Sequence, residues 1–163
     1  MECVKCGNKA RFMVVDKKVC KKCFIQLVER RIKREFKAYE VEKGARVLVR
    51  DRACEYILSD VVKLPLNIVK GGKYDHKCLA WTMDDEIEWF LKKMFEGRQK
   101  KKEKGIRLFA QVSSEELKDY FRIKGIDYCV ERSEVNLMID ELTKKYPQIK
   151  NSILNSKERI EGL

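Results

Sequence analysis

Four cysteines at the start of the chain have the spacing of metal ligands. Cys3 and Cys6 form one Cys-x-x-Cys unit, and Cys20 and Cys23 form a second one shortly after it. Two residues between thiols allow one tight turn to present both sulfurs to a single ion, and Gly7 suits the open backbone of such a turn. Because four thiolates fill a tetrahedral site, we expect a structural zinc ion with no open position for catalysis. The spacing leaves an iron–sulfur cluster as the alternative.

Three further cysteines, Cys54, Cys78 and Cys129, are isolated along the sequence. A lone cysteine is most often a small buried hydrophobe, whereas a reactive one needs an exposed and electropositive setting. We therefore expect inert thiols at these positions. A residual enzyme that uses one of them to carry sulfur is the alternative.

Two short elements must position the metal ligands. Residues 9–15 fit a hairpin, and residues 24–37 carry apolar side chains at helical spacing directly after Cys23. The remaining faces of this helix are basic, with Arg30, Arg31, Lys33, Arg34 and Lys37. Such a surface fits contacts with RNA phosphates, and an ordinary solvated helix is the alternative.

The charge of the whole chain also points to a polyanion. The 163 residues carry a net charge of +11; residues 1–37 hold twelve basic and four acidic side chains and so contribute +8 of it. Charge concentrated in this way favours a nucleic-acid partner. No apolar run approaches the roughly 18 residues of a membrane span, and the N-terminus has no apolar signal core. We therefore expect a cytoplasmic protein that does not contact membranes.

From residue 44 onwards, apolar runs alternate with amphipathic helical patterns. This alternation predicts an α/β domain with a mostly parallel, Rossmann-like sheet covered by helices. We expect a zinc-binding module with its basic helix at residues 1–40 and the α/β domain at residues 41–163. A basic loop at 98–105 adds candidate phosphate contacts from Lys100, Lys101 and Lys102. The expected strands cover residues 45–49, 66–69, 78–81, 106–110 and 126–130, and the expected helices cover 55–64, 82–97, 113–124, 133–146 and 150–160.

The stretch Gly71-Gly72-Lys73 has the residue types of a phosphate-binding loop. Such a loop needs a strand before it and a helix after it, whose first amides face the phosphate. Only residues 74–77 separate Lys73 from the next apolar strand, so no helix fits there. We expect a turn between two strands, with a nucleotide-binding loop as the alternative.

The order of these segments resembles the tRNA 2-thiouridine synthetases, the archaeal and eukaryotic cytoplasmic tRNA 2-thiolation proteins and their bacterial relatives. The resemblance rests on the cysteine units with their basic helix and on the strand ending at Val49. It continues through Thr82-Met83-Asp84-Asp85-Glu86, Lys124-Gly125-Ile126-Asp127-Tyr128 and the segment 142–150. In that family a zinc module precedes an adenylating domain of the pyrophosphatase-loop type.

The chain departs from the family where the family performs its chemistry. The family has Ser-Gly-Gly-Lys-Asp-Ser after the first strand, but residues 50–56 of this chain contain no glycine, and Asp51 and Glu55 repel phosphate. The second, catalytic Cys-x-x-Cys of the family is also missing. The resemblance thus implies a truncated, non-catalytic member, similar to the second subunit of the eukaryotic thiolation complex. Asp84 and Asp85 are then expected only to favour the dipole of their helix.

The resemblance also implies partners. We expect tRNA and a catalytic synthetase subunit, in a heterodimer that carries out the 2-thiolation of wobble uridine, with a homodimer as the alternative. Trp81, Trp89 and Phe90 lie near the expected truncated edge, so we expect them to form an exposed apolar interface. A free-standing zinc-ribbon protein that binds RNA or has a regulatory role is the alternative function.

Overall fold

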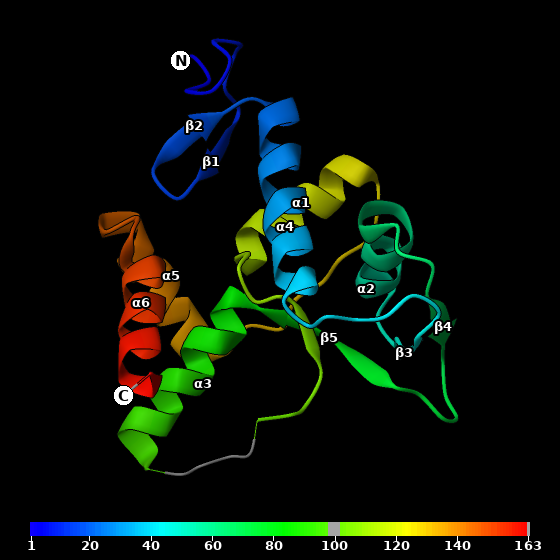
Figure 1. The fold of residues 1–163 in the computed structure, drawn as a ribbon. Coiled ribbons are helices and arrows are strands. Elements are labelled where there is room, and N and C mark those ends of the chain that lie inside the picture. Colours follow the sequence, from blue (N-terminus) through cyan, green and yellow to red (C-terminus); the bar gives the residue numbers. More distant parts are fainter. Residues whose placement is uncertain (98–101, 163) are drawn as a thin grey trace.

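The computed structural model describes residues 1–97 and 102–162, apart from the side chain of Glu96. Two sheets organise the fold (Figure 1). A small antiparallel hairpin consists of β1 (Phe12–Val14) and β2 (Lys17–Val19). A four-stranded sheet has the order β4-β3-β5-β6, and all its pairings are parallel. Its strands are β3 (Arg46–Leu48), β4 (Asn67–Val69), β5 (His76–Thr82) and β6 (Ile106–Phe109).

Helices lie between the strands and after the last one. They are α1 (Lys21–Lys37), α2 (Arg52–Tyr56) with the π-helix η1 (Ile57–Val62), α3 (Met83–Glu96), α4 (Ser114–Lys124), α5 (Glu134–Lys145) and α6 (Ile149–Glu161). Helix α1 contacts β6 and α4, while α3, α5 and α6 pack together at one end of the sheet (Figure 1). This arrangement confirms the predicted α/β class and its mostly parallel sheet.

Local signals set the ends of α3 and α4. Thr82 and Asp85 form a reciprocal capping box at the start of α3, and Ser113 and Glu116 form another at the start of α4. Each box satisfies backbone N–H groups that have no partner inside the helix. Both helices end at a glycine with positive φ, a conformation that costs glycine no steric strain. These ends confirm the boundaries predicted from the sequence.

One apolar cluster joins the N-terminal elements to the sheet. Phe24, Val28 and Ile32 of α1 are fully buried in the same cluster as Phe109 and Phe121 from β6 and α4. The hairpin is attached to this layer because the ring of Phe12 stacks on that of Phe24 at 4.8 Å between centroids. Residues 1–40 and 41–163 therefore share a core.

Residues 126–130 are not the fifth strand that the sequence predicted. Within the described residues this segment pairs with no strand. Its alternate side chains are half-buried, and the ring of Tyr128 lies 4.8 Å from that of Phe121. The period of two therefore reflects an extended segment lying over the core. It does not reflect a hydrogen-bonded ladder.

The predicted helix at 55–64 is also displaced. It begins at Arg52, after an N-cap at Asp51, and its second half is the π-helix η1, which ends at Lys63 with φ of 57°.

Among residues 1–97 and 102–162, no helix is both long and apolar enough to cross a membrane.

Candidate functional site

The hairpin and the start of α1 bring the two cysteine units together. The Sγ atoms of Cys3, Cys6, Cys20 and Cys23 all lie within 4.8 Å of one another. Cys6 Sγ is 3.6 Å from both Cys20 Sγ and Cys23 Sγ. Four thiolates on one tetrahedral ion with bonds of about 2.3 Å would be about 3.8 Å apart. The cluster therefore fits a single metal ion.

Local backbone geometry holds each cysteine unit. Both Gly7 N and Cys6 N donate to the carbonyl of Cys3, which closes the tight turn of the first unit, and Gly7 has φ of 74°. In the second unit, Cys20 is the N-cap of α1 and Cys23 lies in its first turn. The helix thus fixes the second pair of sulfurs, while the hairpin carries the chain from the first pair to the second.

The cysteine thiols differ in acidity before any metal binds. Burial raises the pKa of the Cys3 thiol, but hydrogen bonds with the backbone of Cys20, Lys5 and Cys6 outweigh burial and lower this pKa to about 6. Burial and the neighbouring thiols raise the pKa of Cys23 to about 12. A cation bound by the cluster would therefore have to displace a proton from Cys23 more than from Cys3.

The isolated cysteines occupy two different environments. Cys54 and Cys78 are buried, and Cys129 is exposed. A hydrogen bond with Cys78, followed by burial, raises the pKa of the Cys54 thiol well above its usual value. A buried thiol that resists ionisation is a poor nucleophile. This environment agrees with the expected inert role of Cys54.

At the carboxyl end of β3, the amides that begin α2 have a partner inside the chain. Asp51 Oδ1 accepts hydrogen bonds from Ala53 N at 2.8 Å and from Cys54 N at 3.1 Å. In parallel α/β sheets this edge is where ligands bind, and the first amides of a helix are a common phosphate site. Here a carboxylate of the protein occupies that position. The sequence signal was an Asp directly before an apolar helical run.

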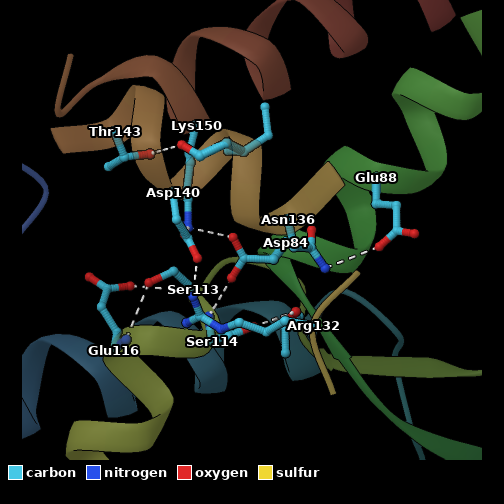
Figure 2. A network of polar contacts seen from close by, with 12 residues as sticks. Asp84, Glu88, Ser113, Ser114, Glu116, Arg132, Asn136, Asp140, Thr143 and Lys150 are labelled. Atoms are coloured by element: carbon cyan, nitrogen blue, oxygen red, sulfur yellow. Dashed lines mark hydrogen bonds and ion pairs between the residues drawn. The ribbon is translucent and has the colours of Figure 1, made fainter. Parts of the chain in front are cut away.

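A second polar site follows β5 and β6 at the same edge (Figure 2). Lys150 lies between Asp84 and Asp140, with Nζ–O distances of 2.5 Å and 2.8 Å, and Asp84 also accepts from Ser114 N at 2.6 Å. Arg132 forms an ion pair with Asp140. The network ties α5 and α6 to the starts of α3 and α4.

Burial makes this network electrostatically strong. The side chains of Lys150 and Asp84 are only 8% and 5% exposed. Burial raises the pKa of Asp84, but the charge of Lys150 and hydrogen bonds with Lys150 and Ser114 outweigh it, so the net shift is downward. Asp85 instead accepts from the backbone and hydroxyl of Thr82 in the capping box. Both aspartates of the Thr82–Glu86 segment therefore have structural partners. The buried role of Lys150 had no signal in the sequence, because lysines in helices are usually solvated.

The basic residues of α1 divide into two groups. Arg30, Lys33, Arg34 and Lys37 are exposed and lie at i, i+3, i+4 and i+7, so they form one stripe. Arg31 points elsewhere: its Nη1 lies 3.0 Å from each carboxylate oxygen of Glu116 in α4, and its side chain is 21% exposed. The stripe is available to a partner, whereas Arg31 joins two helices.

The basic loop is described only in part. Lys102 forms an ion pair with Glu86, and its Nζ lies 4.4 Å from the centroid of the Trp89 ring. Lys100 and Lys101, the other phosphate-binding candidates of this loop, lie outside the described residues.

The glycine stretch is a turn, as predicted. No helix lies between β4 and β5, and Gly72 has φ of 78°. The turn is fixed to β3 because Asp75 Oδ2 accepts from Arg46 N at 2.7 Å and Asp75 N donates to the Arg46 carbonyl at 2.8 Å. These contacts account for the segment as a connection between neighbours of β3.

The expected apolar interface is not exposed. Phe90 is buried, and Trp81 and Trp89 are half-buried. The indole Nε1 of Trp81 donates to Glu86 at 2.7 Å, and cationic side chains cover both rings. The expectation was wrong because the C-terminal helices and charged side chains cover α3, which a linear pattern does not reveal.

Comparison with known proteins finds a solved structure with a similar fold. No protein-family model matches the chain, and no curated protein matches it. The fold is similar to that of a solved tRNA-modifying enzyme, the U34-tRNA thiolase NcsA from Methanococcus maripaludis with its [4Fe-4S] cluster. The TM-score is 0.73 at 15% sequence identity, and the alignment covers 98% of this chain and 88% of that chain. The chain thus has a thiolase-like fold with a four-cysteine cluster near its N-terminus.

Proposed function

We propose that the protein is a non-catalytic, zinc-containing subunit of a cytoplasmic complex that 2-thiolates wobble uridine in tRNA. In this complex it supports tRNA binding, and an ATP-dependent synthetase partner performs the chemistry. The observation that carries the proposal is the position of Asp51 in a thiolase-like fold. Its carboxylate accepts hydrogen bonds from the amides of Ala53 and Cys54, at the sheet edge where parallel α/β folds bind ligands, so these amides are not free to bind a phosphate.

Two further observations support a non-catalytic role. The chain between β3 and α2 has no glycine that would let backbone approach a pyrophosphate, and Glu55 adds a second negative charge beside Asp51. Asp84 is held by Lys150 and Ser114, and Asp85 is held by Thr82. These acidic groups stabilise helices, and neither is free to coordinate a magnesium–nucleotide complex.

The distances between the cysteine sulfurs support zinc as the bound ion. Sulfur–sulfur distances of 3.6 Å match the edges of a tetrahedron around one ion. A four-iron cluster instead places each thiolate on a different iron, which requires the sulfurs to stand further apart. Cys3, Cys6, Cys20 and Cys23 would hold the ion as a closed structural site. Bound zinc would stabilise the hairpin and orient α1.

The exposed stripe of α1 supports tRNA binding. Arg30, Lys33, Arg34 and Lys37 present four cations along about two turns of helix, a spacing that suits successive phosphates. The helix is fixed to the metal cluster at one end and to α4 through Arg31 and Glu116 in the middle. The stripe is therefore rigid, which reduces the entropy lost when RNA binds.

Co-expression with a full-length synthetase that keeps Ser-Gly-Gly-Lys-Asp-Ser tests the proposal. We expect a stable complex with equal numbers of the two chains by size exclusion with light scattering, and faster tRNA thiolation than with the synthetase alone. Calorimetry on the purified chain should show no ATP binding at micromolar concentration. Thiolation of tRNA by the chain alone would overturn the non-catalytic role.

The same experiment separates the alternative function. A free-standing zinc-ribbon protein that binds RNA is favoured by the same basic stripe and requires no synthetase. It would bind tRNA, form no complex with the synthetase, and leave the thiolation rate unchanged. That result would replace the subunit proposal.

A further inference from the structure

A hollow of about 340 Å³ lies between the end of α1 and the end of the π-helix η1. Its walls are apolar and come from Phe36, Val41, Val62 and Leu64. Phe36 is buried, whereas the other three side chains are half-buried and leave apolar surface open to a ligand. The volume lies at the small end of the range of about 300–1,000 Å³ in which proteins hold small ligands.

The rim of this hollow is charged and mainly basic. Lys33, Lys37 and Glu40 line it, and Lys63, which follows η1, is exposed next to Leu64. No described residue forms an ion pair with any of these four charged side chains. Lys33 and Lys37 also belong to the exposed stripe of α1. The hollow and the stripe therefore form one continuous surface that is open to an anionic partner.

The backbone on both sides of the hollow has an unfavourable conformation. Glu40 and Lys63 have φ of 50° and 57°, and they are two of the three non-glycine residues with positive φ in the part of the chain that the structure describes. The helix that ends at the hollow is a π-helix, a rare form that occurs mostly at functional sites. Strained backbone of this kind also concentrates at binding sites. These features mark the hollow as a site that binds a ligand.

We propose that the hollow holds an unpaired base of the RNA whose phosphates bind the stripe of α1. The apolar walls suit the faces of a base, and the lysines on the rim suit the phosphates on either side of it. An apolar side chain of a protein would also fit the walls, but it would leave Lys33 and Lys37 without an anionic partner. The inference rests on the proposed tRNA binding and names the part of the RNA that is recognised, a loop or an end.

Glu40 gives the hollow a group that distinguishes a base from a phosphate. A carboxylate repels phosphate, but it accepts a hydrogen bond from the amino group of a base such as cytosine. In a duplex the same amino group is paired and the face of the base is stacked, so neither is available to the hollow. The site therefore selects unpaired nucleotides, whereas the stripe alone binds phosphates in single strands and duplexes alike.

Filling the hollow with a larger side chain tests the proposal. Leu64→Trp fills it without a change of charge, and Leu142→Trp is the matched control, because it makes the same exchange on α5, away from the hollow. Filter binding over a salt series compares a single-stranded RNA of mixed sequence with its fully paired duplex. We expect Leu64→Trp to weaken binding of the single strand by about tenfold, with its log–log salt slope and the binding of the duplex unchanged. Leu142→Trp should alter neither.

Urea denaturation shows whether the variants fold, and Val41→Trp fills the hollow from a different segment if Leu64→Trp does not. Unchanged binding of the single strand by a folded variant overturns the base site and leaves tRNA binding by the stripe intact. Equal weakening for the single strand and the duplex also overturns it. If the wild type binds neither RNA nor tRNA, the proposed function fails, and the base site fails with it. Loss of the synthetase complex with RNA binding unchanged would assign the hollow to that protein instead.

Discussion

Asp51 is the residue on which the proposed loss of nucleotide binding rests. Its carboxylate caps α2 through Ala53 N and Cys54 N. Asp51→Ala should therefore lower the free energy of unfolding by about 1 kcal/mol, as for other N-caps. Asp51→Ser keeps a hydrogen-bond acceptor and should therefore lower the free energy of unfolding by less than Asp51→Ala. Urea denaturation measures both, and Asp127→Ala, at an exposed acidic residue, is the control that should show no change. A stable Asp51→Ala variant would mean that the cap contributes nothing.

Lys150 is the residue on which the polar network depends. Replacing it with methionine keeps the volume but leaves Asp84 and Asp140 without their shared cation. Loss of one partner from a buried ion pair costs about 3–5 kcal/mol. We therefore expect Lys150→Met to unfold in much lower urea than the wild type. Lys145→Met, an exposed lysine in the preceding helix, should have little effect.

The cost of Lys150→Met should depend on pH. The pKa of Asp84 is lowered in the folded chain, so its charge stabilises the fold above its unfolded pKa of about 3.9, and this stability is lost as pH falls through the folded pKa. Once Asp84 is protonated, it no longer needs a cation. The difference in unfolding free energy between wild type and variant should therefore shrink from pH 7 towards pH 3. An equal difference at both pH values would contradict the charge-based role.

At the scale of elements, we expect the hairpin β1–β2 to depend on a metal bound by the cysteine cluster. Each strand has three residues, too few for independent stability, so metal binding would supply much of the free energy of folding for this module. Cys20→Ser should lose the metal and disorder the hairpin, while Cys129→Ser, at an exposed isolated cysteine, should retain both. Elemental analysis measures the bound metal, and hydrogen exchange measures the order of the hairpin. Iron with acid-labile sulfide in place of zinc would contradict the proposed ion.

The pairing of β5 with β6 requires a glycine at position 105. A Cβ added to Gly105 would lie 2.7 Å from the Lys77 carbonyl oxygen, a backbone atom of β5 that cannot rotate away. Gly105→Ala should therefore push the strands apart and cost about 1–3 kcal/mol. Gly71→Ala is the matched control, because nothing lies within 4 Å of its added Cβ. Equal urea midpoints for the two variants would show that β6 shifts freely.

The elements also show what the sequence could predict. The ends of α3 and α4 followed from Thr82, Ser113 and the closing glycines, because caps depend on residues a few positions apart. The cysteine cluster followed from spacing in the same way. Residues 126–130, Phe90 and Arg31 had no such local signal. Their environments depend on which elements pack beside them, and only the folded chain brings Glu116 to Arg31 or the C-terminal helices to α3.

At the scale of the whole molecule, α1 joins the cysteine cluster, the shared core and the basic stripe. Its apolar positions, Phe24, Val28, Ile32 and Phe36, face inward at intervals of four residues, so the cations at Arg30, Lys33, Arg34 and Lys37 must face out. Arg31 lies between these two faces and pairs with Glu116. The proposed tRNA surface is therefore a consequence of how α1 packs. Its test must separate lost phosphate contacts from lost stability.

A triple variant, Arg30→Ala with Lys33→Ala and Arg34→Ala, makes that separation. It should weaken tRNA binding and reduce the log–log salt slope by roughly 2.1–2.7, since each lost phosphate contact removes roughly 0.7–0.9. The control, Lys43→Ala with Lys73→Ala and Lys118→Ala, removes the same charge from exposed positions outside α1. Arg31→Ala should instead lower stability and leave the salt slope nearly unchanged, because its guanidinium is already paired within the chain. Filter binding over a salt series measures all three. If the α1 triple variant and the control weaken binding equally, net charge rather than this stripe attracts the RNA.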